Sequence, residues 1–202
     1  MPAVRFCDET DFGFGWVDEE GGSVSRTAHA LAVEGRVYLI DPVEGDGVDE
    51  RVAALGKPAG VIVLLDRHRR DSDAFAARLD VPLAETPYEG VPGSPFEFRR
   101  ILRRRFWREV ALWWPERRVL VAADALGTIG YMRSPEELLG VHPFLRIRPP
   151  RRALAGLEPE HILVGHGEGL HGPEAAPALA RALSNARREV PSLVTSLLRR
   201  GR

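Results

Sequence analysis

The chain has 202 residues, 44% of them hydrophobic, and a formal net charge of -1 at pH 7. This length and composition predict one globular domain, residues 1–202, with a full hydrophobic core, and exclude a disordered chain. The near-zero charge excludes a global field that attracts nucleic acid, and no apolar run approaches the roughly 20 residues needed to span a membrane.

Cys7 is the single cysteine, so an intrachain disulfide is excluded and a reducing compartment is favoured. The first nine residues lack the apolar core of a signal peptide. Together these features predict a cytoplasmic protein without a membrane anchor.

The N-terminal part of the chain predicts strands before helices. Residues 25–33 and 36–40 are two β-rich runs around a glycine turn, which predicts a hairpin whose second strand ends at Asp41. Residues 49–55 carry apolar side chains at helical spacing, and Gly56 follows them.

A nearly continuous apolar run at 60–65 predicts a central strand covered on both faces. A cluster of His, Asp and Arg side chains follows at 66–71, a position where α/β proteins often place a metal. Residues 71–79 then predict a helix, with Ser72 as a candidate cap, and 81–84 predicts a short strand.

The second half repeats this order of strands and helices. Residues 96–98, 109–114 and 118–123 predict strands, whereas 128–155 is irregular, with a short helix expected at 135–139. A last strand at 162–164 leads to Gly165-His166-Gly167, and 173–198 predicts helix with a second start near Pro191. Two strand blocks, each followed by helices, favour two sheets with helices outside them.

This order resembles the metallo-β-lactamase fold family, over most of the chain. Four segments carry the resemblance, each ending a predicted strand: Val37-Tyr38-Leu39-Ile40-Asp41-Pro42, Leu65 to Asp71, Val119 to Leu126, and Ile162 to Gly167. The resemblance implies an α/β fold, a four-layer αββα sandwich, with a metal site between the inner edges of the two sheets.

The family's His-x-His-x-Asp-His signature is eroded in this chain. Its first His falls on Asp66, its second on His68, its Asp on Arg70 and its last His on Asp71. The third His of the family, expected just before the strand at 110–114, is missing. The resemblance implies a bridging, catalytic aspartate at Asp124, and the metal ligands it leaves are Asp66, His68, Asp71, Asp124 and His166.

Arg70 would place a permanent positive charge where the family holds a second ion, because a guanidinium does not deprotonate in proteins. The candidate ligands fit one divalent metal, namely zinc, manganese or iron. The alternative is a metal-free site in which Arg70 pairs with Asp71 or Asp124. In that case Arg67 and Arg70 form a cationic pocket for a small anionic ligand.

The sequence therefore leaves two functions open: a mononuclear metal-dependent hydrolase of an ester or phosphoester, or a non-catalytic relative that binds an anion. A nucleic-acid partner is disfavoured, because the arginine-rich run at 99–108 is better explained as an exposed strand edge. The remaining histidines are expected to be structural or at the surface: His29, His142, His161 and His171. Neither the substrate nor the oligomeric state follows from the sequence.

Overall fold

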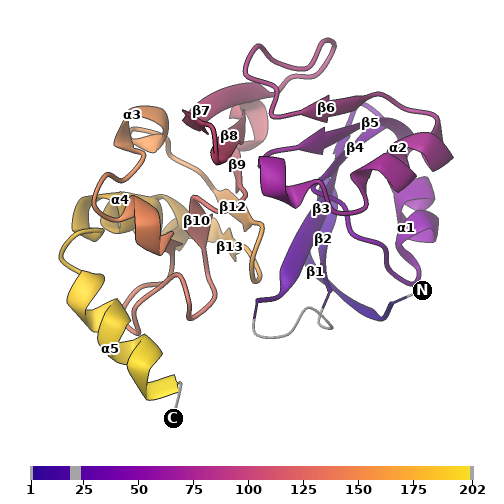
Figure 1. Ribbon diagram of the computed structural model, residues 1–202. Coiled ribbons are helices and arrows are strands. Elements are labelled where there is room, and N and C mark those ends of the chain that lie inside the picture. Colours follow the sequence, from indigo (N-terminus) through magenta and orange to yellow (C-terminus); the bar gives the residue numbers. More distant parts are fainter. Residues whose placement is uncertain (1, 19–23, 201–202) are drawn as a thin grey trace.

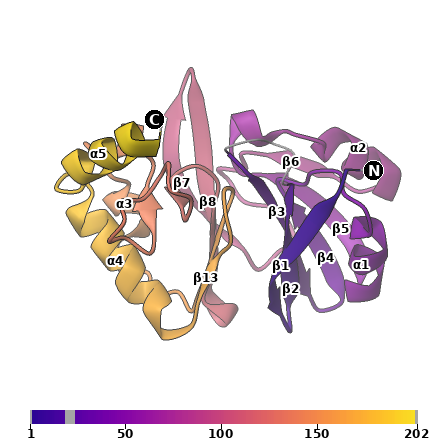
Figure 2. The same cartoon turned by 90° about the horizontal axis from the view of Figure 1, so that it is seen from below.

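The computed structural model describes residues 2–18 and 24–200, and its elements form four layers, two sheets between two sets of helices (Figures 1 and 2). The first sheet has the strand order β1-β2-β3-β4-β5-β6, formed by Val4–Thr10, Gly13–Asp18, Arg26–Val33, Arg36–Ile40, Lys57–Val63 and Leu83–Glu85. The expected αββα sandwich is thereby confirmed.

The second sheet has the order β13-β12-β9-β8-β7. In chain order, β7, β8, β9, β12 and β13 are Glu97–Arg104, Trp107–Trp114, Val119–Ala122, His161–Val164 and Leu170–His171. A separate two-stranded ribbon pairs β10, Leu126–Gly127, with β11, Gly140–Val141.

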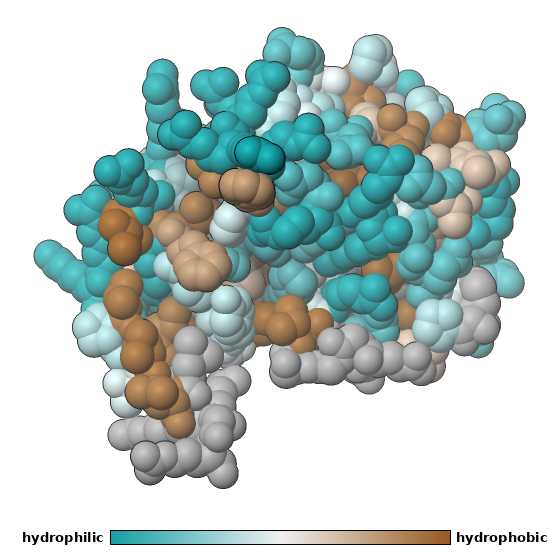
Figure 3. All heavy atoms as spheres, in the orientation of Figure 1, coloured by the Kyte–Doolittle hydropathy of each residue, from teal (hydrophilic) through white to brown (hydrophobic). Residues whose placement is uncertain are grey.

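Helices cover the outer face of each sheet (Figure 2). On the first sheet these are α1, Val48–Leu55, and α2, Ser72–Leu79; on the second they are α3, Arg151–Leu154, and α4, Ala175–Asn185. Helix α5, Val190–Arg200, extends beyond the layers, and an apolar stripe follows it in Figure 3. Among the described residues, no helix is long and apolar enough to cross a membrane.

Short 3-10 turns complete the secondary structure: η1 to η4 are Asp66–His68, Pro115–Arg117, Pro143–Leu145 and Gly172–Glu174. The turn η1 follows β5 directly, and η4 leads into α4. Of these four turns, η1 bears on the candidate site, because it carries the residues of the eroded signature.

Alternate side chains along a strand pack into different layers of the hydrophobic core. In β8, Val110, Leu112 and Trp114 pack between the two sheets, whereas Ala111 and Trp113 pack toward the helices. Successive side chains of a strand point to opposite faces, so a strand covered on both sides reads as an uninterrupted apolar run. This burial explains why the central strands were recognisable in the sequence.

Two pairs of parallel strands direct the polar strand ends to one edge. β4 pairs in parallel with β5, so Asp41 and η1 lie at the same end of the first sheet. β9 pairs in parallel with β12, so Asp124 and His166, which follow these strands, lie at the same end of the second sheet. The rigid strands fix the backbone at these ends, and the side chains that follow them converge. This edge therefore holds the candidate site.

Most predicted elements are confirmed, with shifted bounds. The hairpin is β3 and β4, and the helices expected at 49–55 and 71–79 are α1 and α2. The strand at 81–84 shortens to β6, and the tail helix divides into α4 and α5.

Three expectations were wrong or incomplete. The sequence did not predict β1 and β2. Ser72 makes no capping hydrogen bond, and its buried hydroxyl has no partner among the described residues. Residues 135–139 form turns rather than a helix. The arginine-rich run, by contrast, is largely strand β7 at the edge of the second sheet, so the expected exposed strand edge is confirmed.

The guanidinium of Arg70 joins the two sheets. Nη1 donates to the carbonyls of Thr27, at 2.6 Å, and Asp41, at 3.0 Å, while Nη2 donates to the carbonyl of Gly165 at 3.1 Å. Thr27 and Asp41 belong to the first sheet and Gly165 follows β12 of the second. Arg70 does not hydrogen-bond Asp71 or Asp124 as expected, because both carboxylates bind other donors.

Replacing Arg70 with Met should lower the free energy of unfolding by about 3–5 kcal/mol, because three carbonyls lose a charged donor and Asp41 and Asp124 lose a nearby cation. Urea denaturation followed by tryptophan fluorescence measures the change. The control is Arg69→Ala, whose exposed side chain forms ion pairs with the surface carboxylates Asp73 and Glu85, and its curve should stay close to wild type. Equal curves for the two variants would contradict a linking role for Arg70.

Candidate metal centre

Three side chains converge at the strand-end edge. Nε2 of His68 lies 3.1 Å from Oδ1 of Asp124, and Nε2 of His166 lies 3.0 Å from the same oxygen. One ligand atom from each residue lies within 4.8 Å of the others. His68 comes from η1, Asp124 follows β9 and His166 follows β12, so both sheets contribute.

The second nitrogen of each imidazole also faces an acceptor. Nδ1 of His68 lies 3.1 Å from Oδ2 of Asp41, whose other oxygen accepts from the Leu64 amide at 2.8 Å. Nδ1 of His166 lies 2.7 Å from the Ser25 carbonyl. These outer partners fix the protonated nitrogen as Nδ1 and leave Nε2 for the centre, as in carboxylate-histidine-metal arrangements.

This donor set fits one divalent ion. Without one, each bond from Nε2 to the Asp124 carboxylate needs a proton on that nitrogen, in addition to the proton that the outer acceptor holds on Nδ1. With two neutral rings, two Nε2 lone pairs and a carboxylate oxygen point into one small volume, and three protein ligands with an open position are what a catalytic zinc uses. A second ion does not fit, since the carboxylate its site needs is replaced by Arg70.

Arg67 borders the centre on its exposed side. Its Nη2 donates to Oδ2 of Asp124 at 3.0 Å, and its Nη1 donates to the Phe106 carbonyl at 3.0 Å. The guanidinium also lies 4.5 Å from the ring centre of Trp107, a cation–π distance. The side chain is 45% exposed, so part of the cation faces solvent.

The charges of the cluster favour an ionised carboxylate at its middle. Burial alone would raise the pKa of Asp124, but hydrogen bonds from His166 and His68 outweigh it and hold this pKa well below its ordinary value. For His68, burial and the charge of Arg70 oppose protonation, yet hydrogen bonds with Asp124 and Asp41 raise its pKa.

The structure brings together three of the five expected ligands. Asp66 lies outside the group, because its Oδ2 accepts from the Arg108 amide at 3.1 Å. Asp71 also lies outside, because its Oδ2 accepts from the Glu44 amide at 2.8 Å and holds the loop after β4. Of the expected anion-binding arginines, Arg67 remains at the centre, whereas Arg70 is buried and occupied by carbonyls.

Glu109 is a buried carboxylate that the sequence did not assign to the site. Its Oε2 accepts from Nε1 of Trp107 and its Oε1 from the amide of Ala125, both at 2.7 Å. Burial, with the charge of Asp124 adding to it, raises the pKa of Glu109 to about 7. Its position directly before the apolar strand at 110–114, where the family's third His is expected, was the available signal.

His142, expected at the surface, is buried and packs edge-on against Trp107 at 4.9 Å between ring centres. Because Glu109 and His142 both contact Trp107, they hold the aromatic ring that supports Arg67. Glu109 and His142 thus help to position the Arg67 guanidinium beside Asp124, although neither belongs to the cluster of His68, Asp124 and His166.

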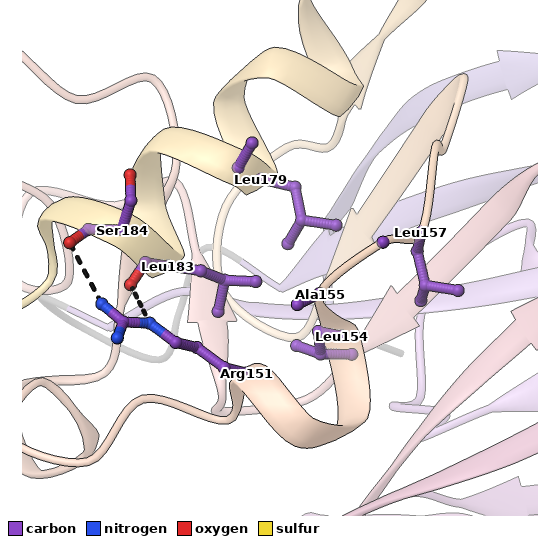
Figure 4. A pocket seen from close by; sticks show the side chains of 9 residues that line it. Arg151, Leu154, Ala155, Leu157, Leu179, Leu183 and Ser184 are labelled. Atoms are coloured by element: carbon purple, nitrogen blue, oxygen red, sulfur yellow. Dashed lines mark hydrogen bonds between the residues drawn. The ribbon is translucent and has the colours of Figure 1, made fainter.

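A cavity of about 420 Å³ lies elsewhere, between α3 and α4 (Figure 4). Leucine side chains line it, and the guanidinium of Arg151 donates to the carbonyls of Leu183 and Ser184. It therefore offers apolar contact without a reactive group, and the His68 cluster remains the candidate site.

No protein-family description and no curated protein matches the sequence. Solved structures do match. DIM-1 metallo-β-lactamase shares 13% identity at a TM-score of 0.60, over 93% of this chain and 98% of that one. A putative diflavin flavoprotein A 5 fragment from Nostoc sp. PCC 7120 shares 11% identity at a TM-score of 0.62, over 98% of this chain and 100% of that one. The metallo-β-lactamase FIM-1 from Pseudomonas aeruginosa, in a mono-zinc form, shares 12% identity at a TM-score of 0.56, over 92% of this chain and 96% of that one.

These likenesses establish that the chain has the metallo-β-lactamase fold, and the resemblance read from the sequence is confirmed at that level. Identities of 11–13% carry no statement about activity. The ligand assignment therefore rests on the geometry of His68, Asp124 and His166 alone.

Replacing Glu109 with Gln should destabilise the protein at pH 8 by about 1–3 kcal/mol, because both oxygens accept hydrogen bonds and an amide nitrogen would face one of the donors. Thermal or urea unfolding measures this loss. Glu97→Gln, at an exposed carboxylate on β7 that pairs with Arg99, is the control and should leave unfolding nearly unchanged. A Glu109→Gln variant as stable as wild type would show that the buried carboxylate does not hold the Asp124 loop.

Proposed function

We propose that the protein is a mononuclear metal-dependent hydrolase that acts on a small anionic ester or phosphoester. One observation carries the proposal: two imidazole Nε2 atoms and one carboxylate oxygen share a small volume, while both Nδ1 atoms are occupied by outer acceptors. Imidazole and carboxylate suit zinc first, with manganese and iron as further candidates. That FIM-1 has a mono-zinc form supports a single-ion centre in this fold.

His68, Asp124 and His166 would hold the ion. A bound divalent ion supplies Lewis acidity toward an ester or phosphoryl oxygen. Asp41 and the Ser25 carbonyl keep the ring protons on Nδ1 of His68 and His166, so that both Nε2 atoms face inward. Asp124 is the central anion: its Oδ1 would join the two Nε2 atoms in holding the ion, while its Oδ2 accepts from Arg67.

Arg67 would bind the anionic part of the substrate. Its guanidinium is held from three sides by Asp124, the Phe106 carbonyl and the ring of Trp107, so little freedom is lost when an anion docks. Arg70 gives the pocket additional positive potential without touching the ligand, because its own donors are used.

A metal-free anion-binding protein is not favoured, because two imidazoles turned inward by dedicated acceptors have no role in such a pocket. Nucleic acid is not the proposed partner either. Two arginines of the run near β7 are paired with carboxylates: Arg99 with Glu97 at 2.6 Å, and Arg108 with Glu85 at 3.5 Å. The buried, unpaired Cys7 supports a cytoplasmic location.

Purified protein loaded with zinc, manganese or iron(II) and then desalted should hydrolyse generic esters or phosphoesters. His166→Ala and His68→Ala should each lose at least about 10²-fold in kcat/KM, since each removes one of three ligands. Arg105→Ala, at an exposed arginine beyond the centre, is the matched control and should keep full activity. Absence of hydrolysis with every metal, or equal activity in the His166→Ala variant, would overturn the proposal.

Arg67→Ala should raise KM for a phosphoester by about tenfold or more, because one charge-assisted hydrogen bond is lost. A neutral ester of similar size should show a much smaller change in KM. Steady-state kinetics on both substrates, with Arg67→Lys as the charge-conserving comparison, separates substrate binding from a general effect on Asp124. Equal losses on both substrates would contradict an anion-binding role.

A further inference from the structure

A second group of histidines lies away from the candidate centre, between the edge strands of the two sheets. His161 in β12 and His171 in β13 are directly opposite each other in the antiparallel register, and their Nδ1 atoms are 2.9 Å apart. At about 3.3 Å per strand residue, His161 lies roughly 16 Å along β12 from His166. The side chain of His171 is 34% exposed, so solvent reaches the pair.

A buried carboxylate orients one member of the pair. Nε2 of His171 lies 2.9 Å from Oδ1 of Asp8, and the amide of Gly169 donates to the same oxygen at 2.8 Å. The Asp8 side chain is 3% exposed; burial would raise its pKa, but a hydrogen bond from His171 and the electrostatic effect of the nearby His29 outweigh burial and lower it. An ionised Asp8 keeps the proton of His171 on Nε2, which leaves a lone pair on Nδ1.

His161 is also suited to present a lone pair. Its Nδ1 shares one proton with Nδ1 of His171 in the 2.9 Å hydrogen bond, and a metal ion that binds both nitrogens displaces that proton. Its ring packs edge-on against Phe12, with 5.2 Å between ring centres, which limits its rotation. The paired strands thus bring two imidazole Nδ1 atoms together, and an outer carboxylate orients one of the two rings.

We propose that His161 and His171 form a second metal site, which binds one late divalent transition ion such as Cu²⁺ or Ni²⁺. At metal–nitrogen distances of about 2.0–2.1 Å, two nitrogens 2.9 Å apart subtend an angle of about 90°. That is the angle between neighbouring ligands in tetragonal Cu²⁺ and Ni²⁺ sites, whereas tetrahedral zinc ligands lie farther apart. Water fills the remaining positions, and Asp8 acts as the positioning residue.

The test titrates full-length protein with Cu²⁺ and records electron paramagnetic resonance spectra. Wild type and His166→Ala should both give a signal with hyperfine structure from two imidazole nitrogens. His171→Gln and His161→Gln should bind Cu²⁺ at this site at least tenfold more weakly. Asp8→Asn should weaken binding about 10- to 100-fold, the usual effect of losing an outer-shell carboxylate. Asn tolerates the left-handed backbone of Asp8, so the variant should fold.

The outcomes separate this site from the proposed hydrolytic centre. Binding that persists in His166→Ala and is lost in His171→Gln supports the proposal, even if no hydrolase activity is found. A His171→Gln variant that binds Cu²⁺ within threefold of wild type would overturn it. Loss of all two-nitrogen signal in His166→Ala would also overturn it, by assigning that signal to the centre at Asp124.

Discussion

The buried guanidinium of Arg70 sets the conditions for everything at the strand-end edge. Its three carbonyl acceptors come from β3, from the end of β4 and from the end of β12, so one side chain fixes the spacing of both sheets. Its charge cannot be removed by deprotonation and must be balanced nearby, and Asp41 and Asp124 are the nearest carboxylates that do so. The cation that holds the edge together therefore also disfavours a pair of divalent ions there.

Under this constraint Asp124 becomes the shared partner of the whole cluster. One of its oxygens meets both imidazoles and the other meets Arg67. A carboxylate placed between cations and hydrogen-bond donors stays ionised. One divalent ion beside it would be repelled less by the Arg67 and Arg70 cations than two ions would. The proposed single-ion centre is thus consistent with the charges that surround Asp124.

Sequence alone predicted the three central residues, because each follows an apolar strand, and parallel strands bring their ends to one edge. It could not exclude Asp66 and Asp71. Both are close to His68 in the chain, but η1 and the left-handed backbone of Arg70 turn them toward the Arg108 and Glu44 amides. Glu109 was missed for a related reason: charge counting cannot distinguish a solvated glutamate from one buried within a strand, as Glu109 is in β8.

The two histidine sites share one backbone feature that no sequence pattern reveals. Asp8 and Asp41 both adopt the left-handed region, with φ of 52° and 46°, where residues other than glycine are uncommon. Each is buried, and each holds a ring nitrogen of a histidine whose other nitrogen faces a second candidate ligand. A strained backbone persists where the surrounding structure imposes it. At both positions it holds a carboxylate against the ring nitrogen of a histidine that points away from the candidate ligand cluster. The recurrence at both histidine clusters argues that Asp8 is placed for His171 as Asp41 is placed for His68.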